Sequence, residues 1–495
     1  MRTRTTLAAA ALLAAGALLG WLAALGRLAP DVQAQDKPTT QKSPAGFPAP
    51  DEVQRLYDEA DLNRAVQAYR FFYPTVSGAA IFKGNAEVGG VDNKVFGIID
   101  TKPRHVGFTY NSDTPYGFVQ LDLNAGPFII ELPPGPLIVV ALDINQRWVG
   151  DMGIPGPDEG KGGKHLILPL GYKDKVPDGY HVCKSTTNRL LVGVRSLPVG
   201  GDVKGAIDRI QTIKVRPLNP PADGTEPKWL NLTDKPQDTT PLKWENNLKF
   251  WEVLHEVIDK EPVYEGYRNQ YGELAALGIA QGKPFAPDAR MKGILEQAAK
   301  VGLAQMRAQS FADRRPDRVV WKDRKWEWVG LRPENGDFNT ASYADLEARE
   351  VWFYQAIGAS PAMFRRKAGA GSLYWLGLRD EKNAYLDGGK TYKLTVPQPV
   401  PGKLFWSVTV YDAETRSQIQ TDQGKAALRS LFELKDKAGE KSVDLYFGPK
   451  TPDGKEGRWI KTIPGKGWFV YFRIYGPEQP AFDGSWKPDD FEEVK

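Results

Sequence analysis

Two stretches of the chain consist of short apolar runs separated by Gly, Pro, Asn and Asp, and this texture constrains the fold more than any other feature. The first stretch extends from about residue 79 to 217 and includes Val95–Ile99 and Phe128–Leu132. The second begins near residue 385 and includes Leu404–Tyr411 and Trp468–Tyr475. Runs of this length between turn residues are typical of β-strands. Closely spaced strands without intervening helices favour a sandwich or a jelly roll.

Helical periodicity precedes the first stretch and separates it from the second. Apolar side chains recur near helical spacing over residues 51–73, and Pro74 is expected to end this helix. The same spacing predicts three further helices, over Trp244–Ile258, Pro287–Gln309 and Tyr343–Ile357. We expect Ser342 to cap the last of them. The sequence therefore predicts a mainly β protein with a helical middle segment (α+β), in which two antiparallel β-sandwich or jelly-roll-like domains flank the helices.

The first 34 residues have the features of a signal peptide. Arg2 and Arg4 precede an apolar run from Leu7 to Leu25, and Val32-Gln33-Ala34 offers the small residues that a signal peptidase needs before its cut. The composition of residues 35–50 predicts a disordered linker. We therefore expect a periplasmic or secreted protein with no membrane span after cleavage. The alternative is an N-terminal anchor retained in the inner membrane, because the apolar run approaches the ~20 residues that span a bilayer.

The changes of texture divide the mature chain into three regions. We expect an N-terminal helix plus β domain over 51–240, a helical connecting region over 241–384 and a C-terminal β domain over 385–495. The single cysteine, Cys183, excludes an intrachain disulfide. The near balance of 65 Lys and Arg against 61 Asp and Glu argues against nucleic acid as a partner. A homo-oligomer stays open.

Seven short motifs in the two halves of the chain carry a resemblance to a known family. They are YRFFYPTVSG (Tyr69–Gly78), NSDTPY (Asn111–Tyr116), GPDEGKGG (Gly156–Gly163), LDGGKTY (Leu386–Tyr392), FWSVTVYD (Phe405–Asp412), TRS (Thr415–Ser417) and RIYGP (Arg473–Pro477). The chain resembles the two-domain proteins that join domain of unknown function 1254, at the N-terminal side, to domain of unknown function 1214. The resemblance implies β-sandwich or jelly-roll-like domains with helical segments, often in bacterial envelopes. It brings no assigned reaction and no catalytic residues.

The NSDTPY motif places several polar groups directly before a strand. Asn111, Asp113 and Tyr116 are therefore candidate ligand-binding residues, because polar loop residues on a rigid scaffold often carry function. The structural alternative is that Asn111 and Asp113 hydrogen-bond to their own backbone, with Pro115 fixing the bend.

Three more candidates come from the second β region. Strand alternation places Trp406, Val408 and Val410 on one face, which we expect to be core, and Phe405, Ser407, Thr409 and Tyr411 on the other. Tyr411, Arg416 and Arg473 are therefore better ligand candidates than Trp406.

The remaining motifs give no local signature of catalysis. The Gly-rich segment Gly156–Lys164 lacks the spacing of a phosphate loop, and no nucleophile elbow is present. The four histidines have no zinc-motif spacing, so we predict no metal and no cofactor. The weaker alternative is a cupin-like site that combines His165 and His181 with Asp143 or Asp151.

Two functions are compatible with this sequence. The first is an exported protein of unassigned activity that binds a small ligand, a carbohydrate or an amphipathic organic compound, between its two β domains. The alternative is a periplasmic hydrolase whose polar groups meet only in three dimensions, with Asp113, Tyr116 and Arg416 as candidate catalytic residues.

Overall fold

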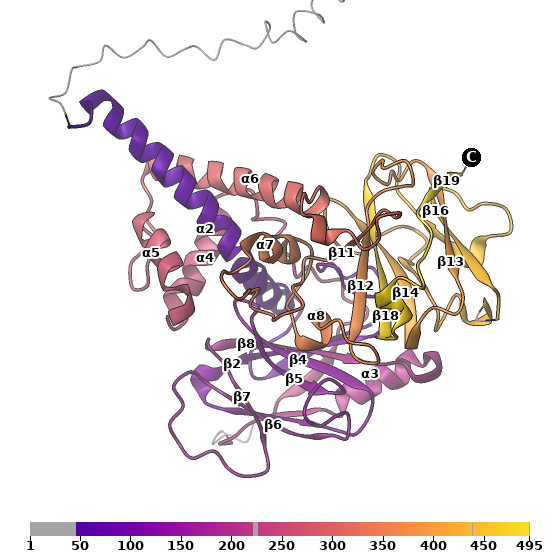
Figure 1. The fold of residues 1–495 in the computed structure, drawn as a ribbon. Coiled ribbons are helices and arrows are strands. Elements are labelled where there is room, and N and C mark those ends of the chain that lie inside the picture. Colours follow the sequence, from indigo (N-terminus) through magenta and orange to yellow (C-terminus); the bar gives the residue numbers. More distant parts are fainter. Residues whose placement is uncertain (1–45, 221–225, 438, 495) are drawn as a thin grey trace, which may run out of the picture. The chain divides into compact units, whose positions relative to one another are not determined.

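The computed structural model describes residues 46–220, 226–437 and 439–494. The expected signal peptide (1–34) and most of the expected linker (35–50) lie outside these residues. Leu62–Lys495 form one compact unit, which contains all the sheets described below (Figure 1).

The N-terminal β region consists of two sheets. The six-stranded sheet has the order β10 (Lys228–Asn231), β1 (Val95–Ile99), β2 (Tyr116–Asp122), β8 (Arg189–Ser196), β4 (Leu137–Asp143) and β5 (Trp148–Gly153). The four-stranded sheet has the order β7 (His181–Lys184), β6 (Gly163–Leu168), β3 (Phe128–Leu132) and β9 (Lys214–Pro217). The pairs β1/β10 and β6/β7 are parallel and the others antiparallel. Both sheets contribute to one hydrophobic core, so they pack face to face.

The C-terminal β region repeats this arrangement. Its five-stranded sheet has the order β11 (Trp326–Trp328), β12 (Ser372–Gly377), β18 (Trp468–Pro477), β14 (Gly402–Asp412) and β15 (Ala427–Arg429). Its four-stranded sheet has the order β17 (Trp459–Lys461), β16 (Ser442–Gly448), β13 (Thr391–Pro397) and β19 (Glu492–Val494). Trp406, Val408 and Val410 lie in the core shared by these two sheets, which confirms the predicted alternation of β14.

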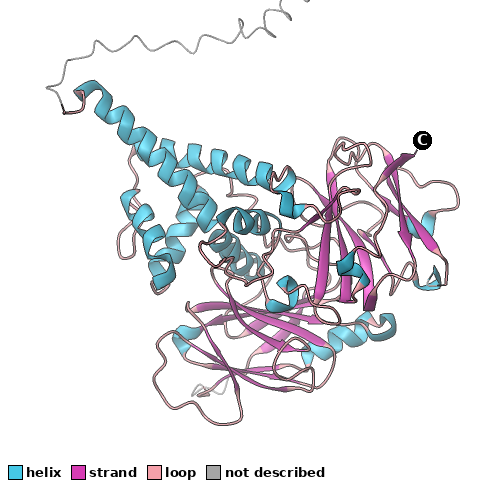
Figure 2. Ribbon diagram, viewed as in Figure 1, coloured by secondary structure: helices cyan, strands magenta, loops and turns pink. Residues whose placement is uncertain are grey.

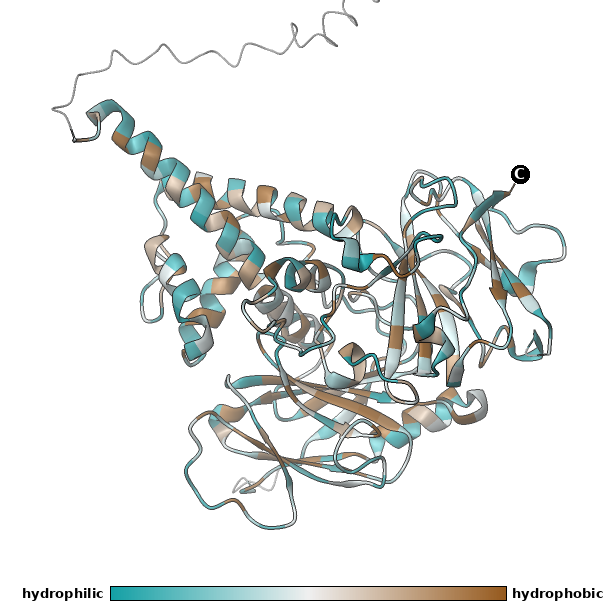
Figure 3. Ribbon diagram, in the orientation of Figure 1, coloured by the Kyte–Doolittle hydropathy of each residue, from teal (hydrophilic) through white to brown (hydrophobic). Residues whose placement is uncertain are grey.

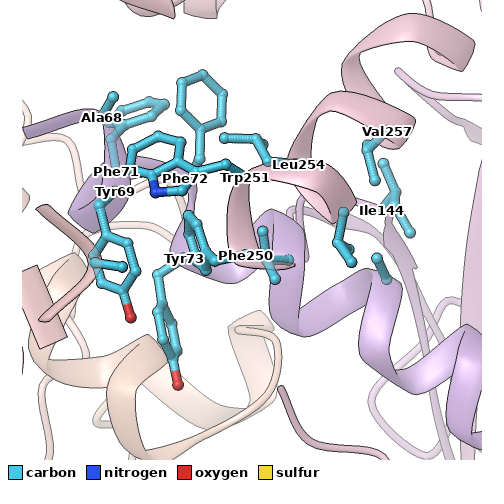
Figure 4. Close-up of a cluster of buried hydrophobic side chains, with 14 of the residues drawn as sticks. Ala68, Tyr69, Phe71, Phe72, Tyr73, Ile144, Phe250, Trp251, Leu254 and Val257 are labelled. Carbon is cyan, nitrogen blue, oxygen red and sulfur yellow. The ribbon is translucent and has the colours of Figure 1, made fainter. Parts of the chain in front are cut away.

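Helices form the third part of the compact unit (Figure 2). They are α2 (Pro50–Glu87), which belongs to this unit from Leu62 onward, α3 (Val203–Gln211), α4 (Lys249–Lys260), α5 (Arg268–Ala276), α6 (Ala289–Phe311), α7 (Leu346–Gln355), α8 (Pro361–Phe364) and α9 (Pro480–Asp483). From Leu62 onward, α2 packs its aromatic side chains against α4, where Phe250 and Trp251 lie close to Tyr69 (Figure 4). Burial of such large aromatic side chains supplies much of the stability of this layer.

The prediction that Pro74 ends the first helix was wrong. The helix α2 continues to Glu87, and Pro74 lies inside it, fully buried. A proline removes one backbone hydrogen bond, but tertiary contacts hold the second half of this helix on all sides. A Cβ at Gly78 would lie 2.2 Å from the carbonyl oxygen of Ile144, and one at Gly84 would lie 2.0 Å from that of Asp238. Small residues at these positions allow the close approach of the two backbones. They also interrupt the apolar periodicity on which the helix prediction was based.

The cap of α7 also differs from the prediction. Asp345, rather than Ser342, is the N-cap, and its side chain accepts a hydrogen bond of 3.0 Å from the amide of Ala348. Both residues are good N-caps, and Asp345 additionally places a negative charge at the positive end of the helix.

The predicted fold class is confirmed at the level of an α+β protein with two β-rich regions and mostly antiparallel sheets. Hydrophobic residues recur along the strands of both regions (Figure 3). Among the described residues, no helix has the length and apolar character needed to cross a membrane. The domain boundaries at 240/241 and 384/385, and the jelly-roll topology, stay predictions.

Candidate functional site

A cavity of about 840 Å³ lies between the outer face of the six-stranded sheet and the outer face of the five-stranded sheet. Its position follows from strand alternation. In β8, Leu190, Val192 and Val194 enter the core of the N-terminal sandwich. The alternate residues Leu191, Gly193 and Arg195 therefore project from the other face, where they line the cavity.

The wall on the N-terminal side is mostly apolar. β4 contributes Ile138, Val140 and Leu142, and β2, on the other side of β8, contributes Phe118 and Tyr116. Gly193 lies in the middle of this wall, where a Cβ would meet only a methyl group of Val140, at 3.7 Å. The missing side chain at Gly193 therefore leaves space in the cavity.

The opposite wall is aromatic and basic. Tyr471, Arg473 and Tyr475 alternate with the core residues of β18, and Tyr374 lies beside them on the adjacent strand β12. The guanidinium of Arg473 lies 5.0 Å from the ring centre of Tyr471, and that of Arg195 lies 5.4 Å from the ring centre of Tyr475. The two arginines come from different β regions and share one aromatic environment, in which cation–π attraction is favourable.

The mouth of the cavity is bordered by exposed segments. The stretch after α8 contributes Arg365, Lys367 and Gly369–Gly371, and Glu159 and Lys403 lie elsewhere on the rim. Cations therefore outnumber anions at this rim.

Three buried polar atoms of residues that line the cavity lack a hydrogen-bond partner among the described residues: Oδ1 of Asp151, Nε of Arg195 and the hydroxyl of Tyr475. Buried polar groups are normally paired, so an unpaired donor facing a cavity marks a position where a ligand or solvent accepts.

Arg473, a predicted site residue, does line the cavity, and Tyr411 holds it in place. Arg473 donates to the hydroxyl of Tyr411 over 2.6 Å and to the carbonyl of Thr109 over 2.8 Å. Tyr411 in turn donates to the carbonyl of Tyr110 over 2.7 Å and is fully buried outside the cavity lining. Tyr411 is thus a positioning residue for Arg473.

The NSDTPY motif forms a local turn and also contributes residues to the cavity lining. The side-chain oxygen of Asn111 accepts from the amides of Asp113 and Thr114 at 2.8 and 2.9 Å, which is the local turn of the structural alternative. The amide nitrogen of the Asn111 side chain donates to the hydroxyl of Tyr116 over 2.7 Å. Asn111 and Tyr116 also line the cavity.

Asp113 lies behind the cavity wall. It is fully buried, and one carboxylate oxygen accepts from the hydroxyl of Ser407 over 2.8 Å. Burial raises the pKa of Asp113, and the positive charges of Arg473 and Arg429 oppose this effect. Asp113 does not line the cavity.

Arg416 belongs to a separate buried cluster. It is fully buried, and its guanidinium pairs with Glu245 at 2.7 Å and lies 4.2 Å from the ring centre of Tyr354 and 4.6 Å from that of Phe108. Tyr73 donates to the same carboxylate over 2.7 Å. The structure therefore brings together Asn111, Tyr116 and Arg473 at the cavity, with Tyr411 and Asp113 directly behind, and leaves Arg416 apart.

Asp151 is a cavity residue for which the sequence suggested only a metal role. It lies on β5, is 8% exposed and lines the cavity near Ser360. Burial raises the pKa of Asp151 to about 6, although Trp148, Ser360 and Arg365 oppose this effect. A carboxyl group with such a pKa exchanges protons near neutral pH.

The histidines form no metal site within the described ranges. His165 and His181 are opposite each other in the parallel pair β6/β7, with ring centres 5.0 Å apart, and Nε2 of His165 lies 3.2 Å from Asp158. Burial lowers the pKa of His165 to about 4, so this imidazole is neutral. Asp143 instead accepts hydrogen bonds from Thr186 and the amide of Arg147.

Comparison with known families identifies both β regions. The model of the protein of unknown function DUF1254 matches residues 96–217, and that of the protein of unknown function DUF1214 matches residues 371–479. The chain is a two-domain DUF1254–DUF1214 protein. The order of the two domains is the one that the sequence motifs predicted. The lining therefore combines residues of both domains, with Ile138, Leu191 and Arg195 in the DUF1254 region and Tyr374 and Arg473 in the DUF1214 region.

A solved structure shares the fold of this DUF1254–DUF1214 protein. The crystal structure of the VPA0106 protein from Vibrio parahaemolyticus is similar with a TM-score of 0.55 at 17% identity, over 88% of this chain and 100% of that chain. A protein of Burkholderia cenocepacia described as uncharacterized is more distant, with a TM-score of 0.38 at 12% identity over 90% and 97% of the two chains. No curated protein matches the sequence. The likeness to VPA0106 shows the fold alone.

The residues missed by sequence reasoning are those on the outer faces of the two sheets. Arg195, Tyr374 and Tyr471 lie in no motif, and Tyr475 was not singled out within RIYGP, but each alternates with core residues of its strand. The available signal was that Arg195 lies on the same strand face as Leu191 and Gly193. A charged residue on an otherwise apolar strand face indicates a special environment.

Proposed function

We propose that the DUF1254–DUF1214 protein binds a small amphipathic organic molecule in the cavity between its two β domains. The observation that carries the proposal is the cavity itself. Its volume of about 840 Å³ lies within the ~300–1,000 Å³ usual for small-molecule sites, and its walls are apolar and aromatic with a few convergent polar groups. The apolar wall of β4 and β8 favours an amphipathic compound over a carbohydrate.

The test is to fill the cavity without touching its polar groups. In Gly193→Leu, the new side chain would start 3.7 Å from Val140 and extend into the empty space. The probe is N-phenyl-1-naphthylamine, an uncharged fluorophore that brightens in apolar sites. We expect the wild-type protein to bind it and Gly193→Leu to bind it at least about tenfold more weakly, because the occupied volume is lost.

The matched control is Gly272→Leu. Gly272 is an exposed residue of α5, and a Cβ there would meet no atom within 4 Å. This variant should bind the probe like the wild type. Binding by Gly193→Leu that equals the control, or no binding by the wild type, would refute the proposal.

A second candidate function is hydrolysis, and Asp151 is the observation that favours it. A carboxyl group with a pKa of about 6 inside a cavity suits general acid–base catalysis. Of the catalytic candidates from the sequence, Tyr116 lines the cavity, whereas Asp113 and Arg416 support hydrolysis less because neither lines it. Asp151→Asn should abolish turnover of any ester, sulfate or glycoside that the wild type hydrolyses. Turnover that survives in this variant would remove Asp151 from the mechanism.

We also propose that the protein is exported to the periplasm or secreted. The support is the basic and apolar start of the sequence followed by Val32-Gln33-Ala34. N-terminal sequencing of the protein expressed at full length in a Gram-negative host should give Gln35 as the first residue. A protein that still begins at Met1 and sediments with the membrane would favour the anchored alternative.

A further inference from the structure

The polar end of the cavity contains more positive than negative charge. Arg195 and Arg473 both face it. The third arginine nearby, Arg429, is neutralised by Glu433, with which it forms two hydrogen bonds of 3.0 and 2.6 Å. Asp113 is the remaining carboxylate, and it interacts with Arg473 from behind the wall.

Arg195 forms no ion pair with a carboxylate of the described residues, and the acid that interacts with it electrostatically is Asp113, behind the wall. Burial opposes the charge of Arg195, but the neighbouring phenols of Tyr475, Tyr116 and Tyr374 raise its pKa on balance, so the guanidinium is charged. Of the acids that line the rest of the cavity, Glu159 pairs with Lys161, whereas Asp151 interacts only electrostatically with Arg365 and keeps one buried oxygen without a partner. Buried charges in proteins are normally paired, and a ligand can supply the missing partner.

The donors around Arg195 also have the geometry of an anion site. Its Nε and the hydroxyl of Tyr475 are both buried without a partner, and they belong to adjacent residues of opposite walls. Arg473 is held rigidly next to them by Tyr411 and Thr109. Charge-assisted hydrogen bonds from a guanidinium to a carboxylate or phosphate oxygen are among the strongest in proteins.

We propose that the ligand is an amphipathic organic anion, whose head group binds to Arg195, Tyr475 and Arg473 and whose apolar part lies along Ile138, Val140 and Leu191. This inference rests on the proposed function and adds the charge and orientation of the ligand to it. The basic residues Arg365, Lys367 and Lys403 at the mouth attract an anion toward the cavity.

Three probes of equal chain length test the sign of the charge: decanoate, decan-1-ol and decylammonium. Each competes with N-phenyl-1-naphthylamine at pH 7.5, and its dissociation constant is obtained from the loss of fluorescence. We expect decanoate to bind about tenfold or more tightly than decan-1-ol, and decylammonium to bind most weakly. Decyl sulfate then distinguishes a carboxylate-specific site from a general anion site.

The variants are Arg195→Met and, as a control, Arg216→Met. Arg216 lies on β9, away from the cavity lining. Arg195→Met should reduce decanoate affinity about tenfold or more and leave that of decan-1-ol unchanged, whereas Arg216→Met should change neither. The melting temperature of each variant without probe verifies folding, and Tyr475→Phe is the second variant where Arg195→Met unfolds.

The possible failures are distinguishable. Binding of all three probes with equal affinity, or a preference for decylammonium, would overturn the anion inference and leave the proposed function intact. Binding of none of them, together with no binding of the fluorophore, would overturn both.

Discussion

Removal of the Glu245 carboxylate should destabilise the protein without weakening ligand binding in the cavity. Glu245 is the acid that pairs with the fully buried Arg416, and it also accepts a hydrogen bond from Tyr73. In Glu245→Gln, a single side-chain oxygen replaces the carboxylate, and the amide group faces either the guanidinium or the hydroxyl. Nε and Nη1 of Arg416 already lack partners, so no other acceptor is available to them.

The magnitude follows from the interactions that are lost. A charge-assisted hydrogen bond contributes about 1.5–3 kcal/mol and a neutral one about 0.5–1.5 kcal/mol, so we expect a loss of about 2–4 kcal/mol in the free energy of unfolding. The ring contacts of Arg416 with Tyr354 and Phe108 remain and keep the loss below the upper end of the range for broken buried pairs. For the unit Leu62–Lys495, an unfolding entropy of about 2.1 cal/mol/K per residue gives a decrease in melting temperature of about 2–4 °C.

The assay combines thermal unfolding with fluorophore binding. Glu245→Gln should melt at the lower temperature and bind N-phenyl-1-naphthylamine like the wild type, because neither Glu245 nor Arg416 lines the cavity. The double variant Glu245→Gln with Arg416→Met should be more stable than the sum of the single effects predicts, since the buried charge is gone. An unchanged melting temperature with lost binding would refute this reasoning and return Arg416 to the ligand site.

Three further predictions concern single side chains. Burial raises the pKa of Asp151 to about 6, so the stability that the protonated carboxyl provides is full below pH ~4 and is lost as the pH rises through 6, a loss of about 3 kcal/mol. Asp151→Asn should therefore flatten the pH dependence of the free energy of urea unfolding. An unchanged pH profile would contradict this prediction. Tyr475→Phe removes a hydroxyl without a partner, so the melting temperature should stay within about 1 °C while decanoate affinity falls. Gly78→Ala should lower the melting temperature by several degrees, because its Cβ would lie 2.2 Å from the carbonyl oxygen of Ile144; equal stability would mean that α2 can shift.

The parts of the fold that the sequence predicted best are those with local signals. The predicted runs Val95–Ile99 and Phe128–Leu132 coincide with β1 and β3, and the alternation of β14 placed Trp406 in the core. Short polar strands such as β7 and β10 have no apolar run and were missed. The second half of α2 was missed because its packing, rather than its periodicity, stabilises it.

The candidate site could be predicted only in part, since its residues meet through long-range contacts. Arg473 was found because it lies in a family-like motif, and Arg195 was missed because only its position in the sheet reveals its role. Arg416 has the side-chain chemistry of a ligand-binding residue, but its carboxylate partner, Glu245, lies 171 positions away in the sequence. No pattern along the chain reports such a pairing.

The motifs that carry the family resemblance converge beside the cavity. Thr109 donates its amide to the carbonyl of Arg416 over 2.9 Å, and Gln418 donates to the carbonyl of Asn111 over 3.1 Å. Ser112 donates to the side chain of Gln418 over 2.8 Å, and Ser407 donates to Asp113. The polar residues of NSDTPY therefore join the two domains, and the shared cavity exists because they do.

The position of Asp113 behind the wall implies an electrostatic role, and a single substitution can distinguish this role from a catalytic one. Asp113 is the carboxylate that offsets the charge of Arg473, and it does not line the cavity. Asp113→Asn keeps an acceptor for Ser407 and removes the negative charge, so decanoate should bind about two- to tenfold more tightly. A catalytic or ligand-binding role predicts the opposite, a loss of turnover or affinity. Weaker decanoate binding at an unchanged melting temperature would show that Asp113 contacts the ligand, because the charge argument permits only a gain.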